Sequence, residues 1–116
     1  MANPVVHFEI LGPDGPKLRD FYQSVFDWQP QVMPGPMDYG SISAGAAGGI
    51  GGGIGGGDAA RVTFYVQVDD IDGYLRQIES SGGKTIVART VIPNVVTFAN
   101  FADPQGNIVG LVESMA

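Results

Sequence analysis

Residues 5–10 read VVHFEI, and this short stretch sets a pattern that the chain uses twice. Apolar and polar residues alternate along it, as they do in a strand that buries only one of its faces. Phe8 and Ile10 therefore point toward a predicted core. His7 and Glu9 share the opposite face.

A helix is predicted directly after this strand. Asp14 stands where an N-cap residue is needed, and Pro16 fits the first helical turn. Apolar side chains then recur at helical spacing and predict one continuous stripe that packs on a sheet. The stripe consists of Leu18, Phe21, Tyr22, Val25 and Phe26. Prolines at 30, 34 and 36 prevent another long helix, so short strands are predicted around residues 28–33 and 39–44.

The same strand and helix recur from residue 61 onward. Residues 62–68 again alternate, with apolar residues on one face and Thr63, Tyr65 and Gln67 on the other. An apolar stripe at helical spacing follows over residues 71–78. Asp69 and Asp70 precede this stripe as N-cap candidates, and Gly82 with Gly83 predicts a left-handed C-cap.

Three further extended runs complete the second copy, at residues 84–88, 95–101 and 107–113. The last two are joined by DPQG at residues 103–106, whose proline and glycine favour a tight hairpin turn. Both halves thus read β-α-β-β-β, and neither could bury its sheet alone. The predicted fold is α+β: a single domain of two βαβββ modules, residues 1–57 and 58–116. We expect them to form one curved mixed sheet with an open concave cup and the helices outside.

The glycine-rich stretch GGIGGGIGGG at residues 48–57 contains a formal G-x-G-x-x-G. A phosphate cradle needs a helix to open after the glycines, whereas here a strand follows, and the run holds no lysine, serine or threonine. Dinucleotide binding is excluded on this ground. A flexible linker and a strand remain as alternatives. Because Ile50 and Ile54 would project from one face, the strand is favoured over residues 48–55, with a hinge at residues 55–57.

Composition narrows the possible functions. The 116 residues are 44% hydrophobic and 16% charged, as in a folded single domain. A net charge of −6 disfavours nucleic acid and anionic membranes as partners. No apolar run approaches the roughly 18 residues that a membrane span needs. The chain has no cysteine, so a thiolate metal site is also excluded. A cytoplasmic location is expected because MANPVVHFEI at residues 1–10 has no basic flank followed by a long apolar run.

These motifs together resemble the vicinal oxygen chelate superfamily, which contains glyoxalases, bleomycin-resistance proteins and extradiol dioxygenases. The resemblance rests on four segments: VVHFEI at 5–10, F-Y-x-x-V-F-x-W at 21–28, FYVQVDD at 64–70 and FADPQGNIVGLVE at 101–113. It covers nearly the whole chain. The sequence is most similar to small two-module, glyoxalase-related members whose activity is not known.

The resemblance implies a divalent ion held in the cup by four side chains, commonly two histidines and two glutamates. His7 matches the first histidine, but the other three positions fall at Thr63, at Gly110 and within residues 51–53. Glu113 lies an odd number of residues from Gly110 and should face the other side of the strand. A catalytic ion needs about three protein ligands. The prediction is therefore that the chain has no metal site of this type and no cofactor.

Eight residues are predicted to contact a ligand: His7, Glu9, Trp28, Thr63, Tyr65, Gln67, Phe98 and Asn100. Aromatic surfaces with a few polar groups are typical of small-molecule pockets. Several roles remain open for His7: a neutral hydrogen-bonded group, a ligand contact, a proton-transfer group, or half of a weak metal pair with Glu9. Trp28 fits the core and the cup equally well.

The sequence thus supports two hypotheses of different kinds. The first is a metal-independent protein that binds a small organic ligand in the cup, similar to the bleomycin-resistance branch. The alternative is a glyoxalase-like isomerase, lyase or dioxygenase with an atypical site.

Asp69 and Asp70 could form a carboxylate pair, but a helix N-terminus explains both. The resemblance also implies a homodimer, the commonest symmetric assembly of soluble proteins.

Overall fold

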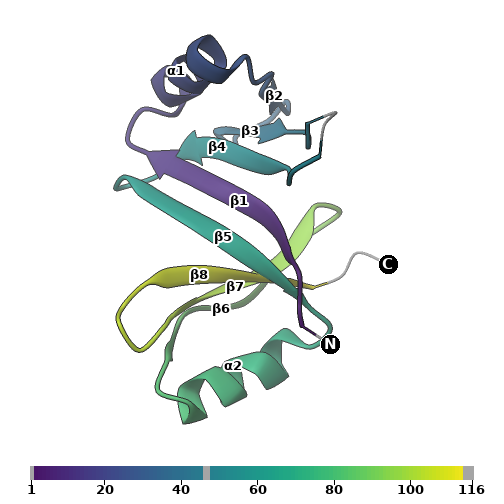
Figure 1. The fold of residues 1–116 in the computed structure, drawn as a ribbon, viewed down its shortest axis with the longest axis vertical. Helices are drawn as coiled ribbons and strands as arrows, with labels where there is room; N and C mark the ends of the chain where they lie inside the picture. The colour runs from purple at the N-terminus through teal and green to yellow at the C-terminus, as the bar shows by residue number, and fades with distance from the viewer. Residues whose placement is uncertain (1, 46–47, 114–116) are drawn as a thin grey trace. The chain divides into compact units, whose positions relative to one another are not determined.

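The structure is a computed structural model that describes residues 2–45 and 48–113, so the predicted outer ends of the modules lie outside it. The chain divides into two compact units (Figure 1). The N-terminal unit is His7–Thr63, and the C-terminal unit combines residues 2–6 with residues 64–113. The elements follow one another as β-α-β-β-β twice along the chain. The predicted α+β class with two βαβββ modules is confirmed.

The N-terminal unit contains a mixed sheet in the order β2-β3-β4-β1. Its strands are β1 (Val5–Gly12), β2 (Gln31–Val32), β3 (Tyr39–Ile42) and β4 (Gly52–Gly56). The β2–β3 and β3–β4 pairs are antiparallel, whereas β4 and β1 are parallel. Ile10 pairs with Ile54, and these two form a buried cluster with Ile42 on the face covered by helix α1 (Gly15–Phe26).

The glycine-rich stretch does form a strand, but its limits differ from the predicted ones. β4 starts at Gly52 rather than residue 48, and Ile50 lies outside it with 44% of its surface exposed. The predicted hinge at residues 55–57 stays a prediction; in the structure its first two residues belong to β4, and its backbone makes hydrogen bonds. The Gly56 N–H donates to the Asp38 carbonyl and the Gly57 N–H to the Gly12 carbonyl, both at 2.9 Å.

Helix α1 begins as predicted, with the Asp14 carboxylate accepting a hydrogen bond from the Lys17 N–H at 3.0 Å. The predicted apolar stripe is only partly correct. Leu18 and Tyr22 pack against the Ile10 cluster, but Phe21, Val25 and Phe26 are more than half exposed. The buried positions of the helix are instead Gly15 and Arg19.

Arg19 occupies the place where an apolar residue would be expected. Its guanidinium donates to the Ile54 carbonyl at 3.1 Å and pairs with the Asp38 carboxylate at 2.8 Å. A Cβ at Gly40 would lie 2.7 Å from the Arg19 Cδ, so only glycine leaves room for the aliphatic part of this side chain. The helix is therefore joined to its sheet through polar contacts as well as apolar ones.

The C-terminal unit repeats the topology with the strand order β5-β8-β7-β6. Its elements are β5 (Arg61–Val68), α2 (Ile71–Ser80), β6 (Lys84–Ile92), β7 (Val96–Ala102) and β8 (Ile108–Glu113); the first three residues of β5 belong to the N-terminal unit. β5 and β8 are parallel, and the two hairpin pairs are antiparallel. The predicted DPQG hairpin is confirmed, since the Gly106 N–H donates to the Asp103 carbonyl and Gly106 has φ +90°.

Helix α2 agrees closely with its sequence pattern. Ile71, Leu75 and Ile78 pack on the core residues of β5, β7 and β8. Gly82 has φ +99°, and the Gly83 N–H donates to the Ile78 carbonyl at 2.9 Å, which completes the predicted C-cap. No helix among the described residues is long and apolar enough to cross a membrane.

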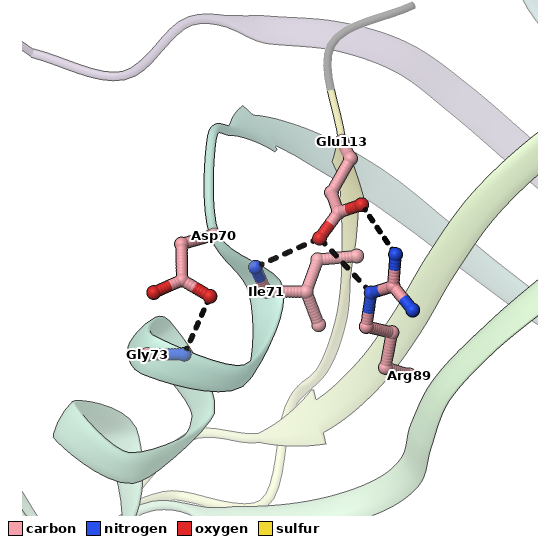
Figure 2. Close-up of polar contacts among 5 residues, drawn as sticks. All are labelled: Asp70, Ile71, Gly73, Arg89 and Glu113. Atoms are coloured by element: carbon pink, nitrogen blue, oxygen red, sulfur yellow. Dashed lines mark hydrogen bonds and ion pairs between the residues drawn. The ribbon is translucent and has the colours of Figure 1, made fainter.

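Two carboxylates bind backbone N–H groups at the start of α2, as Figure 2 shows. The Asp70 carboxylate accepts from the Gly73 N–H at 3.1 Å, so Asp70 is the N-cap. The Glu113 carboxylate accepts from the Ile71 N–H at 3.2 Å and pairs with the Arg89 guanidinium at 3.0 Å. Glu113 thus lies on the α2 side of β8, as its odd spacing from Gly110 predicts.

Candidate ligand-binding faces

Each unit has one sheet face covered by its helix and one face without a helix. We call the second of these in the N-terminal unit the N-face, defined by His7, Glu9, Leu11, Tyr39 and Arg61. The strand register explains the first four, because the residues of β1 and β3 that alternate with the buried isoleucines point this way. Arg61 joins them because its guanidinium lies beside the Glu9 carboxylate.

His7 and Tyr39 form a polar pair on the N-face. The His7 Nε2 and the Tyr39 hydroxyl are 2.8 Å apart, and the two rings are stacked with a 16° angle between their planes. Burial lowers the pKa of His7 below its ordinary value of 6.5, and the nearby Glu9 carboxylate partly offsets this. His7 is therefore neutral near pH 7. Depending on the tautomer, its Nε2 accepts a hydrogen bond from the Tyr39 hydroxyl or donates one to it.

Glu9 and Arg61 lie beside this pair. The Arg61 guanidinium is 4.0 Å from the Glu9 carboxylate, which is only 13% exposed. Thr63 lies two residues further along β5, on the same side of that strand as Arg61, and is 3% exposed. The Arg61 Nε and the Thr63 Oγ1 are buried without a hydrogen-bond partner among the described residues.

We call the helix-free side of the C-terminal unit the C-face, defined by Tyr65, Gln67, Phe98, Asn100 and Gly110. Strand register places Tyr65 opposite Gly110 and Gly110 opposite Asn100, so these three form one row across the sheet. Gln67 and Phe98 both pair with Val112 in the neighbouring row. Asn100 is 3% exposed, and within the described ranges its Nδ2 has no hydrogen-bond partner.

A tyrosine ring covers a glycine on each of the two faces. A Cβ at Gly53 would overlap the Tyr39 ring, and a Cβ at Gly110 would overlap the Tyr65 ring. The glycines thus make room for the aromatic rings. These are also positions where the resemblance places carboxylate ligands: Gly110 itself and, within residues 51–53, Gly53.

The residues present do not fit the divalent ion that the resemblance implies. Gly110 has no side chain and is covered by Tyr65, the position within residues 51–53 falls on glycine throughout, and Thr63 replaces the second histidine. Over residues 2–45 and 48–113, no three histidine, cysteine, aspartate or glutamate side chains gather closely enough to hold a metal. His7 with Glu9 provides two donors, fewer than the roughly three protein ligands of a catalytic ion.

Trp28 lies on the helix side of its sheet rather than on the N-face. It packs against the Ile10 cluster and stacks on Tyr22 with ring centroids 5.4 Å apart. It also lines a depression of about 470 Å³ together with Phe26 and Ile42. Of the two roles that the sequence left open for Trp28, core packing is therefore observed.

Sequence reasoning missed the two polar residues of the N-face that accompany His7 and Glu9, and it also did not single out Leu11. Tyr39 lies in a proline-rich segment without periodicity, so the pattern gave no reason to single it out. Arg61 begins the strand that contains Thr63 and Tyr65, and counting the alternation back by two residues would have placed it on their side. The glycines of β4 were a further signal, because a glycine within a strand often marks close approach of another group.

Comparison with known proteins agrees with this architecture. The family model of the Glyoxalase/Bleomycin resistance protein/Dioxygenase superfamily matches residues 5–111. Among curated proteins, none matches the sequence.

Solved structures share the fold at low sequence identity. A superfamily member from Vibrio splendidus 12B01 is 16% identical with a TM-score of 0.66, over 97% of this chain and 100% of the other. A methylmalonyl-CoA epimerase from Streptomyces coelicolor, in complex with 2-nitronate-propionyl-CoA, is 12% identical with a TM-score of 0.71, over 100% and 97%. The epimerase from Mycobacterium tuberculosis is 13% identical with a TM-score of 0.69, over 97% and 88%.

Proposed function

Because the chain belongs to the Glyoxalase/Bleomycin resistance protein/Dioxygenase superfamily, we propose that it binds a small organic ligand on its helix-free faces without a metal ion. The observation that carries this proposal is the pair of tyrosine rings, Tyr39 over Gly53 and Tyr65 over Gly110. They put an aromatic surface where a metal-binding member would need a carboxylate. Aromatic surface with a few fixed polar groups suits an organic ligand.

The proposed contacts follow from the two faces. In the N-terminal unit they are His7, Glu9 and Thr63, as the sequence predicted, with Tyr39 and Arg61 added. On the C-face they are Tyr65, Gln67, Phe98 and Asn100. The buried Nδ2 of Asn100, which no acceptor meets among residues 2–45 and 48–113, supports this set, since a donor without a partner is costly unless a ligand or water satisfies it.

A ligand panel tests the proposal. Compounds are screened by thermal shift, because a ligand that binds only the native state raises the melting temperature. The panel includes acyl-CoA esters, since a structural neighbour is a methylmalonyl-CoA epimerase. A compound that stabilises the wild type should stabilise Tyr39→Phe and His7→Gln less, whereas Tyr74→Phe, on helix α2, should respond like the wild type. Unchanged responses in the first two variants would remove the N-face from the proposal.

Metal independence has its own test. Purified protein is analysed for metal content and titrated with nickel, zinc, manganese and iron(II). We expect substoichiometric metal and no shift in melting temperature that depends on His7. One equivalent of a divalent ion, lost in His7→Gln, would overturn the metal-independent proposal.

A second candidate function is favoured by the His7–Tyr39 pair. A neutral imidazole with a lowered pKa can act as a general base, and a phenol 2.8 Å away can donate a proton. This would be proton transfer at a carbon next to a carbonyl group, as in isomerases. Ligands from the panel are incubated in D₂O, and mass spectrometry measures deuterium uptake. Deuterium uptake that is lost in His7→Gln would support this proton-transfer activity. If no bound ligand takes up deuterium, ligand binding without catalysis remains as the proposed function.

We also propose that the chain forms a homodimer, which the exposed apolar side chains of α1 support. The cytoplasmic location stays a prediction of the sequence.

A further inference from the structure

A hollow of about 320 Å³ lies at one end of the N-face. Leu11 and residues 57–61 line it, so its walls are mostly backbone and small apolar side chains, with Arg61 and Asp58 as its charged members. This volume suits a small organic group rather than a whole cofactor.

Arg61 differs from the two other arginines whose partners are defined. Arg19 and Arg89 each contact a carboxylate at 3.0 Å or less, whereas Arg61 stays 4.0 Å from Glu9. That distance is too long for a hydrogen bond. The Nε–H is buried, and among the described residues no acceptor meets it, while about a third of the side chain reaches solvent. Arg61 itself lines the hollow, so its guanidinium is next to any group that enters there.

Thr63 provides a second polar group nearby. It lies two residues, or about 7 Å, from Arg61 along one side of β5. Its hydroxyl is likewise buried, and the part of the chain that the structure describes offers it no partner. Arg61 lines the hollow and Thr63 is its next neighbour on the same side of β5, and each has a buried donor that no acceptor meets within the described ranges.

The charges around the hollow determine what kind of acceptor fits. The Glu9 carboxylate already partly neutralises Arg61, and Asp58 lines the hollow as well. A ligand carboxylate would gain attraction from Arg61 but would be repelled by these two groups. A neutral carbonyl oxygen can accept the hydrogen bond without that repulsion.

We propose that Arg61 and Thr63 recognise the neutral carbonyl oxygen of a ligand, such as that of an amide, with the aliphatic part of the ligand against Leu11. This inference rests on the proposed ligand-binding function and names the ligand class. Glu9 is then a specificity residue, because its charge makes the hollow prefer a neutral acceptor over an anionic one.

Isobutyramide and isobutyrate provide a matched pair of probes with nearly equal shape. Each is titrated into ¹⁵N-labelled protein, and the Arg61 Nε–H signal is followed by NMR. We expect saturable shifts with isobutyramide and about tenfold weaker binding of isobutyrate. The Thr63→Val variant, which keeps the side-chain shape, should bind isobutyramide several-fold more weakly, and Arg61→Met about tenfold more weakly. Arg76→Met, at an exposed arginine of α2, should bind both probes like the wild type.

Glu9→Gln gives the sharpest outcome, since removal of its charge should reverse the preference so that isobutyrate binds more tightly than isobutyramide. Equal or tighter binding of isobutyrate by the wild type would overturn the inference. So would binding that Thr63→Val and Arg61→Met leave unchanged, or the absence of saturable isobutyramide binding at its solubility limit. If these probes fail while panel compounds still respond to Tyr39→Phe, the proposed ligand-binding function stands and only the carbonyl recognition at Arg61 falls.

Discussion

Tyr39 and Tyr65 each depend on a glycine of a neighbouring strand. An added methyl group at Gly53 would overlap the Tyr39 ring, which has little room to move because its hydroxyl is bonded to His7. We expect Gly53→Ala to lower the free energy of unfolding by about 1–3 kcal/mol, as overpacking in a well-packed region does. Urea denaturation measures this change.

Gly12→Ala is the matched control, because a Cβ there would make only ordinary contact, 3.4 Å from a Leu18 methyl carbon. The double variant Gly53→Ala with Tyr39→Ala should lose less stability than the sum of its single changes, since the alanine at 53 then has space. Equal losses for Gly53→Ala and Gly12→Ala would show that the ring does not need the glycine.

His7 should make stability depend on pH in a defined direction. Its pKa in the folded protein lies below 6.5 because of burial, with Glu9 opposing the shift. Between the two pKa values the unfolded chain binds a proton that the folded chain does not, so unfolding becomes easier as the pH falls below about 6.5. Above that pH the contribution is fully retained, and below the folded pKa it changes no further.

His7→Gln keeps a polar side chain without this titration. Urea denaturation of both proteins at several pH values should show the wild type losing more stability than the variant on acidification from pH 7 toward the folded pKa. A wild type that gains stability relative to His7→Gln over this interval would mean that the imidazole is charged in the folded state.

Helix α1 is held to its sheet by the Arg19 contacts, and their loss should weaken the N-terminal unit. Arg19→Ala removes the ion pair of the Asp38 carboxylate and one hydrogen bond to the Ile54 carbonyl. We expect a loss of about 2–3 kcal/mol, less than for a fully buried pair because Asp38 is 45% exposed. Lys17→Ala, an exposed position of the same helix, should change stability by less than about 0.5 kcal/mol in the same denaturation experiment. Similar losses for both variants would contradict a role of Arg19 in docking the helix.

Helix α2 should instead become sensitive to acid through Glu113. The hydrogen bond from Arg89, and then the one from the Ile71 N–H, hold the pKa of Glu113 below its ordinary value. Its contribution to stability is therefore present above about pH 4.5 and is lost as the pH falls through the lower, folded pKa. Glu113→Gln should reduce this loss of stability at low pH, whereas Asp20→Asn should not. Thermal melts between pH 3 and 7 provide the measurement. The same decrease in melting temperature at low pH in Glu113→Gln and the wild type would contradict a stabilising role of the Glu113 contacts.

The two helices also show how far sequence patterns reach. The stripe of α2 and both of its caps were predictable, because apolar spacing, Asp70 and the Gly82–Gly83 pair all act locally. The apolar stripe of α1 predicted the wrong buried face. Arg19 is buried because it contacts residues far along the chain, and aromatic residues of the stripe are exposed instead. Tyr39 could not be found for the same reason: its partners, His7 and Gly53, are defined by tertiary structure.

Across the chain, both units repeat a single arrangement. In each, the last strand lies parallel beside the first, a helix covers one face, and a tyrosine fills the space above a glycine on the other. This repeated arrangement of a tyrosine above a glycine is the observation from which we propose binding without a metal ion. The alternation that predicts β1 and β5 explains why His7, Glu9, Tyr65 and Gln67 could be placed on the helix-free sides without a structure.

The exposed side of helix α1 gives the remaining prediction, which concerns assembly. Phe21, Val25 and Phe26 are 56%, 54% and 57% exposed, an apolar surface that monomeric proteins seldom leave open. We expect the wild type to be a dimer by light scattering after gel filtration, and the double variant Phe21→Ser with Phe26→Ser to be a folded monomer. Val91→Ser on β6, at an equally exposed valine, should stay dimeric. A monomeric wild type would refute the proposed dimer. A double variant that is still dimeric would show that the interface does not depend on these side chains of α1.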